Sequence, residues 1–115
     1  MPLFRLFLLG CLLAIIAYTS VTIVNHGWGL LPIFFGDMAA MGWPGQFNLD
    51  FFTMLLLSGL WVAWRHHFSA VGFALAVVAV LGGMLFLSVY LLFNSFRCRD
   101  DFAVLLLGEA RAARR

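Results

Sequence analysis

Three long apolar runs constrain the fold of this chain more than any other feature of its sequence. They cover residues 3–24, 47–64 and 69–93, and only Arg5 and Asp50 place a charge inside them. A helix needs about 20 apolar residues to cross a hydrocarbon core of roughly 30 Å. The sequence therefore predicts an all-α integral membrane protein with three transmembrane helices.

Composition points to the same class. Hydrophobic residues make up 64% of the 115 residues and charged residues 10%, whereas a soluble domain is about one-quarter charged. The length allows one domain at most, and we expect the lipid bilayer to be its main environment. All basic residues are arginines, and they are scattered. Because nucleic-acid binding requires a clustered basic surface, we expect no nucleic-acid partner.

Two alternatives for the N-terminus compete with a retained first helix. Residues 8–11 read Leu-Leu-Gly-Cys, as in a lipoprotein cleavage box, and cleavage after Ala17 or Ser20 would define an ordinary signal peptide. The apolar stretch before Cys11 is shorter than the usual region of about 7–15 residues, and the run continues beyond it. We therefore expect a retained transmembrane helix. Cys11 and Cys98 should lie at different depths, so no disulfide is predicted between them.

An interfacial or re-entrant loop is predicted between the first two transmembrane helices, over residues 25–46. Its apolar part, residues 30–41, is too short to span, and irregular backbone at membrane depth must be shielded by protein. Pro and Gly within residues 43–46 predict a β-turn. Asn48 is then the expected N-cap of the second helix, with Asp50 in its first turn, where the helix dipole favours a carboxylate.

Small side chains recur at steps of three and four residues along the third apolar run. In lipid, such a stripe lets two helix backbones approach closely. The sequence therefore predicts a helix-packing surface, used within the chain or between copies, that consists of Ser69, Gly72, Ala76, Ala79 and Gly83.

Three polar residues are predicted to lie on one side of the membrane: His26, Asp37 and Asp50. An imidazole and two carboxylates could bind a divalent metal or transfer a proton. No helical ligand spacing supports a metal site, and helix-end or solvated positions explain all three residues, so no metal is predicted. Asp50 is the strongest candidate, because an ionisable group at the edge of a span often has a function.

Aromatic and basic side chains at the ends of the spans are predicted to anchor the chain at the membrane–water interface. Neighbouring helical residues point about 100° apart, so His66 and His67 cannot both bind one haem iron. No cofactor is predicted, and haem or a metal would need ligands from a partner subunit. No catalytic triad or phosphate loop is recognisable, so we expect no enzyme. The predicted anchors are Trp28, Trp43, Trp61, Trp64, Arg65, His66 and His67.

The tail, residues 94–115, is predicted to form a short amphipathic segment on anionic lipid. Three spans would place the N-terminus and Arg65 on one side, and the tail and the loop on the other. The arginines near the spans then give conflicting orientations, with a cytoplasmic tail favoured. The tail's charged residues are Arg97, Arg99, Asp100, Asp101, Glu109, Arg111, Arg114 and Arg115.

Residues 34–69, FFGDMAAMGWPGQFNLDFFTMLLLSGLWVAWRHHFS, resemble a group of small, uncharacterised three- to four-helix bacterial membrane proteins, with a looser match at Gly82-Gly83. The resemblance implies a multi-pass protein of the bacterial inner (cytoplasmic) membrane, and no activity. It also implies that residues 36–37, 43–46 and 48–50 form one structural unit. The basic tail lies outside the resemblance.

The expected function is that of a non-enzymatic accessory or assembly subunit of a larger membrane complex, packing through the third helix. The alternative is a homo-oligomeric carrier or channel for a small solute or a proton, with Asp50 lining the path. Co-purification of different subunits would favour the first, and self-association alone would favour the second.

Overall fold

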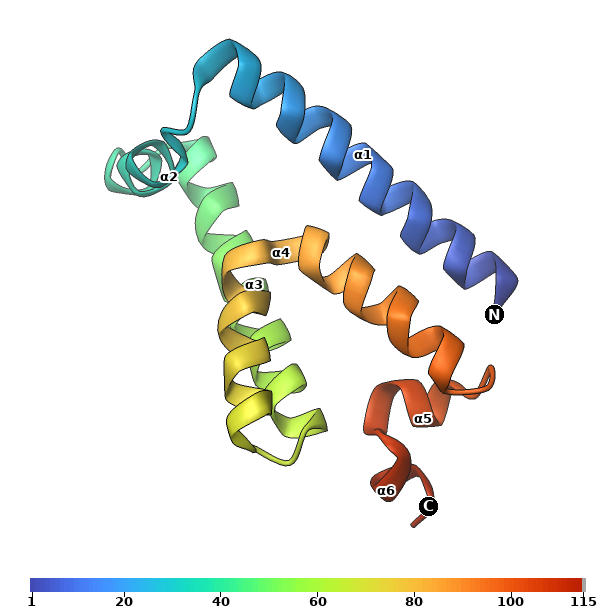
Figure 1. The fold of residues 1–115 in the computed structure, drawn as a ribbon. Coiled ribbons are helices and arrows are strands. Elements are labelled where there is room, and N and C mark those ends of the chain that lie inside the picture. Colours follow the sequence, from blue (N-terminus) through green and yellow to red (C-terminus); the bar gives the residue numbers. More distant parts are fainter. Residues whose placement is uncertain (115) are drawn as a thin grey trace.

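A computed structural model describes residues 1–114, and this part of the chain contains helices and no strands. Helices α1, α3 and α4 are each long and apolar enough to cross a membrane. The all-helical prediction is therefore confirmed, and the three helices suggest a membrane protein. Arg115, predicted to meet anionic lipid, lies outside the described residues. The helices are α1 (Pro2–His26), α2 (Leu30–Ala39), α3 (Trp43–Arg65), α4 (Ala70–Arg97), α5 (Phe102–Leu107) and α6 (Glu109–Ala112) (Figure 1).

Helix α3 and the first half of α4 form a closely packed antiparallel pair. A Cβ atom on Gly59 of α3 would lie 2.9 Å from Val80 Cγ2 and 3.2 Å from the Ala76 carbonyl oxygen. On α4, a Cβ atom on Gly72 would lie 3.3 Å from the Ala63 carbonyl oxygen. Glycine at these two positions therefore allows the backbones to approach each other closely.

Helix α4 is broken at Gly83. This residue has φ 57° and ψ −137°, a conformation that glycine adopts far more readily than other residues. Before the break, α4 runs away from the α3–α4 loop toward Phe51, whose Cζ would be 3.2 Å from a Cβ on Gly83. After the break the chain returns, so that Tyr90 lies beside His66, their ring centroids 5.9 Å apart. Both ends of α4 therefore lie at the same end of the molecule (Figure 1).

Helix α1 packs against the second half of α4. Arg5 Nη2 donates to the Ser95 carbonyl at 2.8 Å and to Asp100 Oδ1 at 2.9 Å. The N-terminal amino group lies 3.6 Å from the same Asp100 oxygen. The N-terminus, the α3–α4 loop and the tail thus share one end of the molecule. Three complete crossings would place the tail opposite the N-terminus, whereas here the two pack side by side because the backbone of α4 reverses at Gly83.

The start of α3 differs from the prediction as well. The predicted β-turn at residues 43–46 is the first turn of α3, where Pro44 is tolerated because its missing N–H has no helical partner to lose. Asn48 is not an N-cap: it lies inside α3, and its Nδ2 donates to the Phe34 carbonyl of α2 at 3.1 Å. Asp50 therefore lies beyond the first turn. A Cβ on Gly45 would overlap the Asp37 carbonyl, so α2 lies directly against α3.

Candidate functional site at the arginine-rich end

The tail is held on the end of α3 by side chains that bind the carbonyls of α5. Trp61 Nε1 donates to the Leu106 carbonyl at 3.0 Å, and Arg65 Nε donates to the Leu105 carbonyl at 2.7 Å. Arg65 Nη2 lies 3.4 Å from the Val104 carbonyl. The last carbonyls of a helix have no partner within it. Trp61 and Arg65 therefore cap the C-terminal end of α5 from another helix.

Tyr90 connects this contact to α4. Its hydroxyl accepts a hydrogen bond from Arg65 Nη1 at 3.1 Å and lies 2.6 Å from His66 Nε2. The Tyr90 side chain is buried, and the Trp61 ring packs edge-on against it with centroids 5.9 Å apart. Burial, and then the positive charges of Arg65 and His67, lower the pKa of His66 below its ordinary value of 6.5. This lowered pKa favours the neutral form of His66.

Arg111 attaches α6 to the same end of α3. It donates a hydrogen bond to the Trp64 carbonyl. Its guanidinium carbon lies 3.9 Å from the centre of the Trp64 ring, a distance typical of a cation–π contact. Two arginines and two tryptophans thus join the tail to α3.

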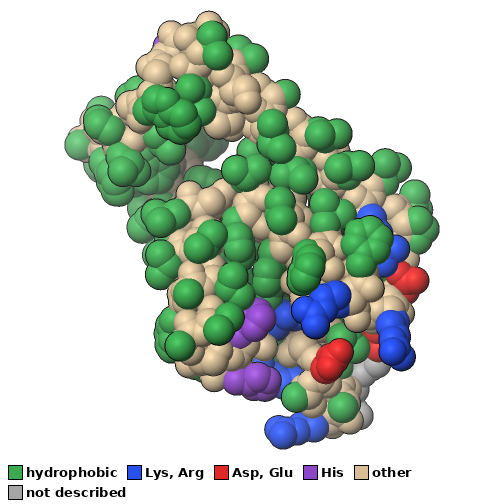
Figure 2. Space-filling model, viewed as in Figure 1, with side chains coloured by type: hydrophobic (Ala, Val, Ile, Leu, Met, Phe, Trp, Pro, Cys, Tyr) green, Lys and Arg blue, Asp and Glu red, His purple; other side chains and the backbone are tan. Residues whose placement is uncertain are grey.

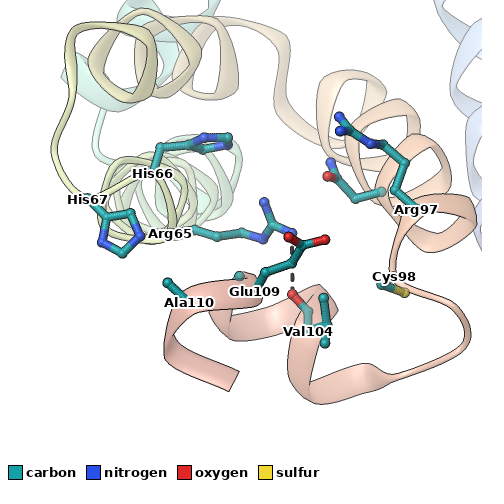
Figure 3. A pocket seen from close by; sticks show the side chains of 10 residues that line it. Arg65, His66, His67, Arg97, Cys98, Val104, Glu109 and Ala110 are labelled. Carbon is teal, nitrogen blue, oxygen red and sulfur yellow. Dashed lines mark hydrogen bonds between the residues drawn. The ribbon is translucent and has the colours of Figure 1, made fainter. Parts of the chain in front are cut away.

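A polar hollow of about 300 Å³ opens between the ends of α3 and α4 and the helices of the tail. Figure 3 shows Arg65 and His66 on one side of it and Arg97 on the other, with Glu109 extending from the tail. Asn94 lies one turn before Arg97 on α4. Side chains from four segments of the chain therefore converge on this hollow, whose polar lining residues are Arg65, His66, His67, Asn94, Arg97 and Glu109.

The structure does not bring the three predicted polar candidates into one site. His26 ends α1, Asp37 lies in α2, and Asp50 is exposed on α3. All three belong to the end of the molecule opposite the hollow (Figure 1). Within residues 1–114, no group of three or more His, Cys, Asp or Glu side chains could hold a metal ion.

The predicted interfacial anchors divide into two groups. Trp28 and Trp43 are 84% and 74% exposed near the far end of α1 and the start of α3. Trp61, Trp64, Arg65 and His66 instead have partners in the tail or in α4. His67 is exposed in the α3–α4 loop.

The predicted small-residue stripe faces α3 within the chain. Ala79 is 1% exposed, and Gly72 and Gly83 each lie against α3 side chains or backbone. Ser69 has another role, because its hydroxyl accepts a hydrogen bond from the Gly72 amide at 3.1 Å and caps the start of α4.

Sequence reasoning missed Tyr90, Ser95 and Asp100 as contact residues. Tyr90 and Ser95 are polar residues within or just beyond an apolar run, and such groups need partners when they are buried. That signal was present, but it did not identify the partners. Arg5 and Asp100 are separated by almost the whole chain, and only the reversal of α4 brings them together.

No known family model matches this chain, and no curated protein or solved structure shows significant similarity to it. The fold defines an all-helical protein with three helices of membrane-spanning length and hydropathy. Its function is therefore inferred from its own residues.

Proposed function

We propose that this protein is a non-enzymatic accessory or assembly subunit of a membrane complex, and that it contacts its partner through the second half of α1. The exposure of α1 carries this proposal. Every residue from 13 to 33 is exposed apart from Ile23, whereas the first half of α1 packs against α4. Half of a membrane-length helix therefore lacks a partner within the described chain.

One face of this half of α1 suits contact with another helix. Ala14, Ala17 and Val21 follow helical steps of three and four residues, and with Tyr18 and Asn25 they line a groove. Small residues let a second helix approach closely, and polar side chains can form hydrogen bonds between helices in lipid. A partner helix would cover both kinds of group.

The small-residue stripe of α4 is not proposed as the partner surface. Gly72, Ala79 and Gly83 already pack against α3, so a partner could reach them only by separating the two helices. Enlarging these residues would test the folding of the chain rather than its assembly.

The distribution of arginine supports a cytoplasmic location for both termini. No Lys or Arg occurs in residues 6–64, and the described arginines gather at the end that holds the tail (Figure 2). Basic residues close to membrane spans favour the cytoplasmic side. We propose that this end faces the cytoplasm of a bacterial inner membrane and that α4 enters and leaves the membrane on that side.

Native mass spectrometry of the protein extracted in mild detergent from its own membrane tests the assembly role. We expect larger, different subunits to co-purify with the wild type, and to be lost from the Ala14→Leu/Ala17→Leu variant. Thr19→Leu is the matched control, because residue 19 lies on the opposite side of the helix and also gains bulk. Retention of the subunits by the double variant would contradict the α1 contact.

A carrier or channel formed by several copies is the second candidate, and the position of Asp50 favours it. Asp50 is exposed on α3 between the exposed Leu49 and Phe51, and within the described residues its carboxylate has no hydrogen-bond donor. An unpartnered carboxylate on an apolar helix suits a proton or cation path. Asp50→Asn should then abolish flux into vesicles with no change in oligomer size. Unchanged flux would exclude this function.

A further inference from the structure

The hollow at the arginine-rich end holds a guanidinium that has no hydrogen-bond acceptor among the described residues. Arg97 contacts the Phe93 ring at 5.6 Å, and among the described residues no carbonyl or carboxylate accepts a hydrogen bond from it. Arg65, on the opposite wall, makes three hydrogen bonds and has five N–H donors in all. Two guanidinium groups therefore line one hollow, and not all of their N–H donors are used.

The charge of the hollow favours an anion. Arg65 and Arg97 contribute two fixed positive charges, and Glu109 contributes the one carboxylate in the lining. Asn94 and the two histidines add further hydrogen-bonding groups. Arginine binds phosphate well because its planar N–H groups match the geometry of the oxygens.

The position of the hollow, at the ends of the apolar helices, indicates which kind of phosphate it could bind. The hollow lies where the apolar helices α3 and α4 end, next to the loop that joins them. The helix ends of a membrane protein meet the lipid headgroups, and basic pockets between such helices bind anionic headgroups. We propose that this hollow binds the headgroup phosphate of an anionic lipid, with Arg97 and Arg65 as its ligands.

The carboxylate of Glu109 should oppose the binding of a phosphate in this hollow. It lines the same hollow as Arg65 and Arg97 (Figure 3). Its negative charge repels a phosphate bound in the same hollow. Removing its charge should therefore strengthen lipid binding, an effect that a misfolded variant would not produce.

Native mass spectrometry of the full chain, titrated with phosphatidylglycerol in zwitterionic detergent, tests the site. We expect Arg97→Gln to weaken lipid binding by about fivefold, as for one arginine near an anionic surface. Glu109→Gln should tighten it by a similar factor. Arg114→Gln removes the same charge from an exposed tail position outside the hollow and should have little effect.

The outcomes separate this site from general charge attraction and from soluble ligands. Equal losses for Arg97→Gln and Arg114→Gln would overturn the proposal, as would weaker binding by Glu109→Gln. Displacement of the lipid by inorganic phosphate at millimolar concentration would instead assign the hollow to a soluble anion. None of these results depends on the α1 contact, so the assembly role can fail while the lipid site holds.

Discussion

At the scale of single residues, Tyr90 joins parts of the chain that are far apart in sequence. Its hydroxyl meets Arg65 of α3 and His66 of the α3–α4 loop, and Arg65 also binds the carbonyls of α5. A buried polar group without a partner is costly, so the contacts of Tyr90 and Arg65 depend on each other.

Replacing Tyr90 by Phe should lower the free energy of unfolding by about 1–3 kcal/mol, because Arg65 and His66 each lose a partner. Thermal or denaturant unfolding in detergent measures this change. Tyr18→Phe is the matched control, because Tyr18 is 79% exposed. Removing its hydroxyl should lower the free energy of unfolding by about 0.5 kcal/mol or less. Equal effects of the two variants would show that the Tyr90 hydroxyl does not stabilise the fold.

His66 should make stability depend on pH. Its pKa in the folded chain is lowered from 6.5 by burial, Arg65 and His67, so below neutral pH the unfolded chain binds more protons than the folded chain. Stability therefore rises with pH and falls as the pH drops below about 6.5 toward the lowered pKa. Unfolding midpoints from pH 8 to pH 5 should show this decrease, and His66→Gln should reduce it. An unchanged slope in His66→Gln would exclude His66 as its source.

At the scale of helices, hydropathy predicted where α1 and α3 lie but not how α4 is shaped. An apolar run has the same composition whether it crosses the membrane once or turns back, so the reversal at Gly83 was invisible to a hydropathy argument. Similarly, Pro44 and Gly45 suit a β-turn and also the first turn of a helix. In the structure these residues form the first turn of α3, and α2 packs against this turn at Gly45. Local sequence propensity does not predict such contacts between separate helices.

Gly83→Ala should disturb the break in α4, because φ 57° with ψ −137° is strained for a residue with a Cβ. We expect the free energy of unfolding to fall by about 1–3 kcal/mol, the usual cost of such backbone strain. Gly10→Ala is the control, since Gly10 lies within α1 with no atom near its Cβ position. Alanine there should be neutral or stabilising. A stabilised Gly83→Ala variant would show that α4 prefers to run straight.

At the scale of the whole molecule, the candidate site could be predicted only in part. Trp61, Arg65 and His66 stood out in the sequence as interfacial residues, but their partners in α4 and the tail did not. Arg5 and Asp100 meet because α4 reverses. That same reversal brings the described arginines together at one end of the molecule (Figure 2).

The proposed arrangement of the helices in the membrane depends most on the return of α4 to the side from which it starts. Labelling of single cysteines with a membrane-impermeant maleimide in sealed vesicles of known orientation tests this directly, with Cys11 and Cys98 replaced by Ala. The positions are Gln46→Cys at the far end, His67→Cys in the α3–α4 loop and Ala113→Cys in the tail, all of which are exposed. We expect residues 67 and 113 to be labelled from the cytoplasmic side, and residue 46 from the other side. Labelling of residues 67 and 113 from opposite sides would mean that α4 crosses the membrane, and would contradict the proposed return of α4.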